Sequence, residues 1–199
     1  MRTLRSALLI LLVLAPPGAE AAEVVFGLEG LTGYNTNVFS QSENGEKDGS
    51  FRGGPFVILR DRTGKLNWEL DYRPSYEAWY TLSGINSFYH FANADVSWRP
   101  SSDWDLYVNE RFSYTPTRST TFQPVQGTVL AQPVPDFTNN QVLQNYATVG
   151  FRHAFTPRLF TDVSASSSLL DYKSNLYSDS SSLGGQGFLT YLLTPRDTV

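Results

Sequence analysis

The chain contains no cysteine, which excludes a disulfide framework, a thiolate metal site and a cysteine for lipid attachment. Its only two histidines, His90 and His153, lie too far apart in the sequence for a zinc-ligand motif. It also lacks a phosphate-binding Gly-Lys motif and any recognisable catalytic triad. We therefore predict that the protein is not an enzyme and that it binds no cofactor and no metal ion.

Positive charge and long hydrophobic runs are also missing. The net charge is −4 and the pI is about 5.1, which argues against a nucleic-acid partner because such a partner needs a basic patch. After residue 15, no run approaches the roughly 18 apolar residues of a membrane-spanning helix, which excludes a helical membrane protein. The length of 199 residues suits one ordinary domain.

The N-terminus has the pattern of a secretory signal. Arg2 and Arg5 precede an apolar stretch, Ala7–Ala15, that is too short to span a membrane. Ala19-Glu20-Ala21 then resembles a cleavage site. We predict a signal peptide over residues 1–21, cleaved near Ala21, and a mature domain over residues 22–199 outside the cytoplasm; a short anchor helix is the alternative.

The most informative stretch is Leu66–Tyr80, LNWELDYRPSYEAWY. Its even positions are mostly aromatic or aliphatic, and its odd positions are mostly charged or polar. Because side chains of a strand alternate between its faces, this pattern predicts one strand with an apolar face and a charged face. At about 3.3 Å per residue the strand would be roughly 50 Å long, about three times the usual length. Such a strand suits a wall between lipid and water.

The same reasoning predicts eight strands along the chain. They are Glu23–Tyr34, Ser50–Arg60, Leu66–Tyr80, Phe88–Arg99, Trp104–Thr115, Gln141–His153, Leu159–Leu170 and Ser182–Leu193. Short connections alternate with longer ones rich in Ser, Gly, Asn and Pro, as in outer-membrane barrels with short periplasmic turns and long external loops. We predict an all-β, antiparallel, up-and-down transmembrane β-barrel whose first strand runs outward.

The short turns carry a weak repeat. Phe155-Thr156-Pro157-Arg158 is echoed by Leu193-Thr194-Pro195-Arg196, and each copy is predicted to mark the inner end of a hairpin. By this pattern a ninth strand would follow, so we expect the chain to be the N-terminal part of a longer protein. The alternative is a complete eight-stranded barrel, whose interior is filled by side chains.

The segment Gly33-Tyr34-Asn35-Thr36-Asn37-Val38-Phe39 follows the first predicted strand. It resembles the "YNxNVF" opening of a family of outer-membrane β-barrel, porin-like proteins of Gram-negative bacteria. The L-T-P-R turns and the W-R-P turn at Trp98 are similar to that family's periplasmic hairpins. The resemblance implies a larger barrel, often linked to surface-polysaccharide export.

Polar side chains of one parity are predicted to line a lumen. The candidates are Asn67, Glu69, Asp71, Arg73, Asp95, Arg99, Asp105, Asn109 and Arg111. Mixed charges on such a wall can set ion selectivity, while the simpler interpretation is a solvated wall with structural ion pairs. If the fourth and fifth strands pair about the turn at 100–103, opposite residue numbers sum to about 202. Asp95 then faces Tyr107.

Glu110 breaks the alternation, because it lies on the lipid parity between Val108 and Phe112. The same register places His90 on a diagonal, within side-chain reach. We therefore expect a His90–Glu110 pair on the lipid face, or else a contact between subunits or a local bulge at Glu110. Some outer-membrane lipid hydrolases have a similar His and carboxylate, but they carry a serine two residues after the histidine, where this chain has Ala92.

The predicted function is passive, as a porin-like channel or a structural component of the bacterial outer membrane. Its expected partners are membrane lipid and small solutes or polysaccharide in the lumen; the oligomeric state stays open. A secreted, soluble β-sandwich that binds carbohydrate or protein, with the aromatic residues as its core, is one alternative. An outer-membrane lipid hydrolase is the other.

Overall fold

The computed structural model describes residues 22–36, 38, 46–116, 141–173 and 178–193. They form β1 (Glu23–Asn35), β2 (Asp48–Thr63), β3 (Leu66–Trp79), a 3₁₀-helix η1 (Ser83–Ile85), β4 (Ser87–Trp98), β5 (Trp104–Pro116), β6 (Gln141–Thr156), β7 (Leu159–Tyr172) and β8 (Ser180–Tyr191). The predicted signal peptide and the second copy of the turn, at 194–196, lie outside the described residues.

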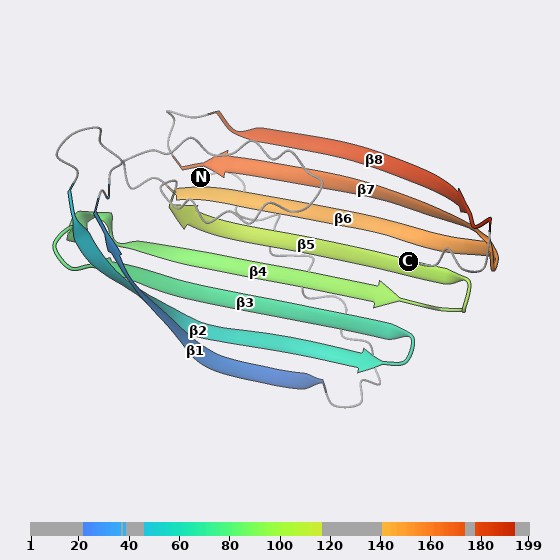
Figure 1. Ribbon diagram of the computed structural model, residues 1–199, viewed down its shortest axis with the longest axis horizontal. Helices are drawn as coiled ribbons and strands as arrows, with labels where there is room; N and C mark the ends of the chain where they lie inside the picture. The colour runs from blue at the N-terminus through green and yellow to red at the C-terminus, as the bar shows by residue number, and fades with distance from the viewer. Residues whose placement is uncertain (1–21, 37, 39–45, 117–140, 174–177, 194–199) are drawn as a thin grey trace.

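All eight strands lie side by side in one antiparallel sheet, in the order β1 to β8 (Figure 1). This confirms the predicted eight-stranded, up-and-down meander. The sheet is not closed into a barrel: within the described ranges, β1 pairs only with β2 and β8 only with β7. Both outer strands therefore present an open edge.

The connections gather by length at opposite ends of the sheet (Figure 1). The end where β2–β3, β4–β5 and β6–β7 join is called the short-turn end, and the other is called the long-loop end. The β2–β3 turn is Gly64-Lys65, and Gly64 has a φ of 59°, which a tight primed hairpin turn requires. The Arg99 N–H donates to the Lys65 carbonyl at 2.6 Å, so neighbouring turns are joined.

The Thr-Pro-Arg motif forms the β6–β7 turn. The Thr156 hydroxyl accepts hydrogen bonds from the backbone N–H groups of Arg158 at 3.2 Å and Leu159 at 3.0 Å. The β6–β7 register shifts between Ala154 and Thr156, and β6 extends three residues beyond its predicted end at His153. Such side-chain bonds are the usual reason that Thr starts a turn.

The predicted register of β4 and β5 is wrong by two residues. Opposite residue numbers sum to 204, so Asp95 lies opposite Asn109 and Ser97 lies opposite Tyr107. The ladder ends at Trp98 and Leu106, and Trp104 belongs to β5 but pairs only with β6. The loop of this hairpin is therefore longer than the turn residues suggest. A shift of two leaves every side chain on its predicted face, because the alternation has a period of two.

Few side chains of the described residues are buried, because the described strands form a single layer. Several of the buried side chains in the described part lie at the long-loop end, where η1 also contacts β3: Ile85, Tyr89, Thr115, Val142 and Leu170. No helix in the described residues is long and apolar enough to cross a bilayer. The architecture thus consists of two broad faces and a small cluster at one end.

Candidate functional site

One face of the sheet, called the apolar face, carries aliphatic and aromatic side chains on every strand. One row across it runs Phe26, Val57, Tyr72, Ala92, Phe112, Asn145 and Leu169. Side chains of this face are strongly exposed on both outer strands: Phe26 on β1 is 83% exposed, and Leu183 on β8 is 84% exposed. An apolar surface that extends over eight strands is much larger than the patches that soluble monomers usually expose.

Aromatic residues and histidines mark both ends of the apolar face. At the short-turn end, the Trp104 ring lies 4.3 Å from His153, which in turn lies 4.6 Å from Phe155. Toward the long-loop end, the Tyr72 hydroxyl is 2.8 Å from His90 Nδ1, and the His90 ring lies 6.1 Å from Tyr114. The residues between these two bands are mostly small or aliphatic.

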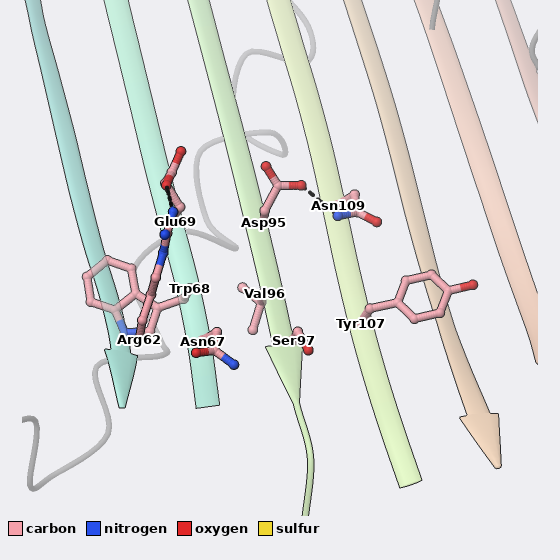
Figure 2. Close-up of a pocket in the computed structure, with 9 residues that line it drawn as sticks. All are labelled: Arg62, Asn67, Trp68, Glu69, Asp95, Val96, Ser97, Tyr107 and Asn109. Carbon is pink, nitrogen blue, oxygen red and sulfur yellow. Dashed lines mark hydrogen bonds and ion pairs between the residues drawn. The ribbon is translucent and has the colours of Figure 1, made fainter. Parts of the chain in front are cut away.

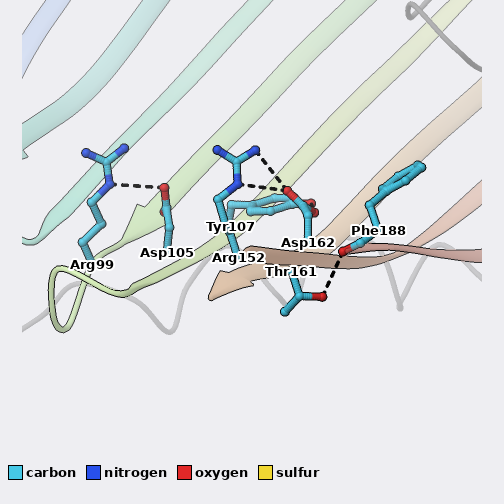
Figure 3. A network of polar contacts seen from close by, with 7 residues as sticks. All are labelled: Arg99, Asp105, Tyr107, Arg152, Thr161, Asp162 and Phe188. Atoms are coloured by element: carbon cyan, nitrogen blue, oxygen red, sulfur yellow. Dashed lines mark hydrogen bonds and ion pairs between the residues drawn. The ribbon is translucent and has the colours of Figure 1, made fainter. Parts of the chain in front are cut away.

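The opposite face, called the polar face, carries the nine residues that were predicted to line a lumen. Register places Asn67, Glu69, Asp71 and Arg73 of β3 on the same side as Asp95, Asp105, Asn109 and Arg111. Arg99, just beyond β4, points to this side as well (Figure 3). The structure thus brings the candidates together on one surface, and their role in a lumen stays a prediction.

Arg73 connects the first three strands across the polar face. Its Nε lies 2.9 Å from the Asp71 carboxylate, and its Nη1 lies 3.3 Å from Glu29 on β1. The guanidinium also stacks over the Phe56 ring of β2 at 5.2 Å. Phe56 in turn covers Gly27 of β1, where a Cβ would lie 2.6 Å from the ring. The Arg73 guanidinium therefore contacts a carboxylate on β1, a carboxylate on its own strand β3, and the aromatic ring of β2 that lies between these strands.

A hollow of about 270 Å³ lies on the polar face near the short-turn end (Figure 2). Glu69 and Asp95 face each other across it, an arrangement that destabilises a sheet unless the charges are compensated. Arg62 binds Glu69 at 3.2 Å, and the Asn109 amide donates to Asp95 at 2.6 Å. Arg111 approaches Asp95 to 4.0 Å. The two carboxylates are thus held apart by separate partners.

A second group of contacts crosses β5 to β7 (Figure 3). The Tyr107 hydroxyl donates to Asp162 at 3.0 Å, and Arg152 binds the same carboxylate at 3.2 Å. The Tyr107 ring lies over Gly150 of β6, where a Cβ would approach it to 2.5 Å. Only a glycine leaves room for this contact.

Sequence reasoning missed this group. The alternation places Tyr107 on the polar face, but it does not single out Gly150, Arg152 or Asp162. The available signal was a glycine inside a well-alternating strand, which often marks a close approach by a neighbour. The partner itself depends on the registers of two successive strand pairs, β5–β6 and β6–β7.

The expected His90–Glu110 pair is not formed. With the observed register, His90 lies opposite Tyr114 and Glu110 lies opposite Ala94, four positions away along β4. Glu110 instead accepts a hydrogen bond from the Asn145 amide of β6 at 2.8 Å. The error follows directly from the two-residue shift, because the diagonal contact needed the shorter hairpin loop.

At the long-loop end, Asp48 joins β2 to the β3–β4 connection. The carboxylate is 4% exposed and accepts backbone N–H bonds from Gly49 at 2.8 Å, Leu82 at 2.9 Å and Thr81 at 3.0 Å. Burial raises the pKa of this carboxyl, but the hydrogen bonds from Leu82, Thr81 and Gly49 outweigh burial and hold it below the ordinary value. The ionised form therefore stabilises this connection.

Comparisons with protein-family models, curated proteins and solved structures found no match to this chain. The described residues contain no cluster of three or more His, Cys, Asp or Glu that could hold a metal ion. What distinguishes the molecule is therefore the pair of faces: aromatic and aliphatic on one side, charged and hydroxyl-rich on the other.

Proposed function

We propose that the chain forms the wall of an outer-membrane β-barrel, with its apolar face toward lipid and its polar face toward a lumen. The observation that carries this proposal is that a continuous apolar face extends over all eight strands, while the ion pairs described above lie on the other face. A membrane barrel requires this alternation on every strand, because lipid-facing and lumen-facing side chains alternate. The resemblance of the YNTNVF opening favours the same assignment.

The distance between the aromatic bands supports a bilayer crossing. On β5, Trp104 and Tyr114 are ten residues apart, which is about 33 Å along an extended strand. With a tilt of about 45° this becomes roughly 23 Å, close to the apolar band of about 25 Å in such barrels. A lipid-bathed sheet cannot leave backbone N–H and C=O groups unpaired. We therefore expect the edges of β1 and β8 to be paired in the membrane.

The chain provides its own probe of this orientation in four tryptophans. Trp98 and Trp104 lie on the apolar face and are 47% and 39% exposed, whereas Trp79 lies on the polar face opposite Ser50. Single-tryptophan variants, with the others changed to Phe, should be reconstituted in vesicles of brominated lipid. We expect strong quenching of Trp98 and Trp104 fluorescence and little quenching of Trp79. Equal quenching of all three would contradict the proposal.

Cell fractionation and gel mobility test the membrane assignment independently. We expect the protein in the outer-membrane fraction, with a mobility that differs between heated and unheated samples. A periplasmic protein without this heat dependence would instead support the soluble β-sandwich, in which a second layer covers the apolar face.

The activity that we assign to the barrel is passive passage of small solutes or polysaccharide, as the family resemblance suggests. Conductance across a planar bilayer separates a channel from a purely structural component. If the polar face lines the pore, Arg73→Gln and Arg111→Gln should shift ion selectivity toward cations, because each removes one positive charge from the wall. Thr32→Gln, on the apolar face, is the matched control and should leave selectivity unchanged.

A further inference from the structure

Glu110 and Asn145 form a polar pair in the middle of the apolar face. The Asn145 Nδ2 donates to Glu110 Oε1 at 2.8 Å, and both side chains are half-buried. Glu110 lies between Ala94 of β4 and Ala147 of β6, and Ser167 of β7 continues the same row. The cross-strand neighbours of Glu110 are therefore small, whereas Asn145 lies between Phe112 and Leu169.

This internal hydrogen bond leaves part of the hydrogen-bonding capacity of both groups unused. A carboxylate has two accepting oxygens, and a primary amide has two N–H groups and a carbonyl oxygen, so one carboxylate oxygen, one N–H and the amide oxygen are left over. If the apolar face meets lipid, as proposed above, a carboxylate at this depth is costly because hydrocarbon supplies no donor. Glu110 is six residues from Trp104 and four from Tyr114, near the middle of the expected crossing.

We propose that the patch Glu110, Asn145 and Ala147 is a contact with a second copy of this chain, and this inference rests on the proposed function. Two copies in one membrane share their orientation, so a two-fold axis along the membrane normal brings equal depths together. With that axis between β5 and β6, the spare Asn145 N–H of each copy reaches the spare Glu110 oxygen of the other. The contact is isologous, because one surface supplies both the donor and the acceptor.

The small residues in the row of Glu110 favour the same occupant. Ala94, Ala147 and Ser167 allow two backbones to approach closely, which is the usual way that protein surfaces pack inside a bilayer. A lipid acyl chain can cover these small side chains, but it has no N–H or O–H group to donate to the Glu110 carboxylate. A second copy does both.

Because the chain has no cysteine, a single introduced thiol reports on this contact. Ala147→Cys should be treated with a short bismaleimide in native membranes and compared with Thr32→Cys on β1, at the far side of the same face. We expect cross-linked dimer for Ala147→Cys in at least about tenfold excess over the control. Equal cross-linking of the two variants, or none for Ala147→Cys, would overturn the inference.

Removal of the polar pair provides a second test. Glu110→Leu combined with Asn145→Leu should raise the dimer dissociation constant in detergent about tenfold or more, the equivalent of about 1.4 kcal/mol. Thr32→Leu, also a polar-to-apolar change on this face, should leave it unchanged. Light scattering measures the mass, and heat-dependent gel mobility confirms that the variants fold. A heat-modifiable wild-type monomer in membranes would refute only the contact, whereas a soluble protein would refute the proposed function.

Discussion

The polar face has two halves with different chemistry. From β1 to β5 it is crossed by ion pairs, such as Arg60–Glu23 at 2.8 Å and Arg99–Asp105 at 3.2 Å. On β7 and β8, apart from Asp162, which pairs with Arg152, serine and glycine dominate, and the Ser168 and Ser182 hydroxyls meet at 2.8 Å. Both halves keep polar groups on the same side, so sidedness does not need charge. The charged half adds specific cross-strand partners, which fix its register more strongly than serine and glycine do.

The largest difference between the halves should appear at their glycines. At Gly54 of β2, a Cβ would overlap the Pro74 carbonyl oxygen and lie 2.7 Å from the Ser75 Cα. Both obstacles are backbone atoms of β3, so Gly54→Ala should destabilise the sheet by about 3 kcal/mol or prevent folding. At Gly184 of β8 the nearest atom is the Ser166 Oγ at 3.6 Å, and Gly184→Ala should change stability by less than about 0.5 kcal/mol.

Urea titrations, monitored by the gel mobility of unheated samples, compare the unfolding midpoints of these two variants directly. A similar shift of the unfolding midpoint for Gly54→Ala and Gly184→Ala would mean that β2 and β3 approach each other no more closely than β7 and β8. The comparison between the halves would then fail at the level of packing.

A smaller effect is expected where the halves meet, at Tyr107 and Gly150. Gly150→Ala should displace the Tyr107 ring and break its hydrogen bond to Asp162, at a cost of about 1–2 kcal/mol. Tyr107→Ala removes the ring and leaves only the Ser164 Cβ, 2.8 Å from the added Cβ, so the double variant should lose less than the sum of the two single variants. Strictly additive midpoints in a double-mutant cycle would show that the ring does not rest on Gly150.

Asp48 makes the stability of the charged half depend on pH at its long-loop end, which lies beyond the proposed membrane crossing. Its folded-state pKa lies below the ordinary value, so its stabilisation is complete above the unfolded-state pKa and is lost as the pH falls through the folded-state pKa. We expect the protection of the Thr81 and Leu82 amides, measured relative to their intrinsic exchange rates at each pH, to fall in acid. Asp48→Asn should abolish this dependence, and exchange in β8 should not follow it. Unchanged pH dependence in Asp48→Asn would assign the effect to another group.

The strands could be predicted because the alternation of apolar and polar residues along each strand identifies its two faces. In β3 and β5, a shift by one residue would move Glu69 or Arg111 to the apolar face, so parity is unambiguous. A shift by two leaves the pattern intact, which is why the β4–β5 register was wrong while every face assignment there was right. Local alternation defines the face on which a residue lies, but it does not define the register between one strand and the next.

Contacts that depend on the register between strands could not be predicted. The bond between Tyr107 and Asp162 needs the registers of β5–β6 and β6–β7 together. The Glu110–Asn145 pair joins strands on either side of the long connection at 117–140, whose length carries no register information. Glu110 itself was conspicuous as a charge on the apolar parity, but its partner was not.

The smallest effect is expected in the serine-rich half. Ser168→Ala together with Ser182→Ala removes a hydroxyl pair that is exposed to solvent, so water replaces the lost hydrogen bond and stability should change by less than about 0.5 kcal/mol. Arg73→Met, which removes an ion pair with the 15% exposed Asp71 carboxylate, should cost more, about 1 kcal/mol. Urea midpoints of the two variants test this order. If the serine variant were the less stable, the hydroxyls of β7 and β8 would set register as strongly as the ion pairs do.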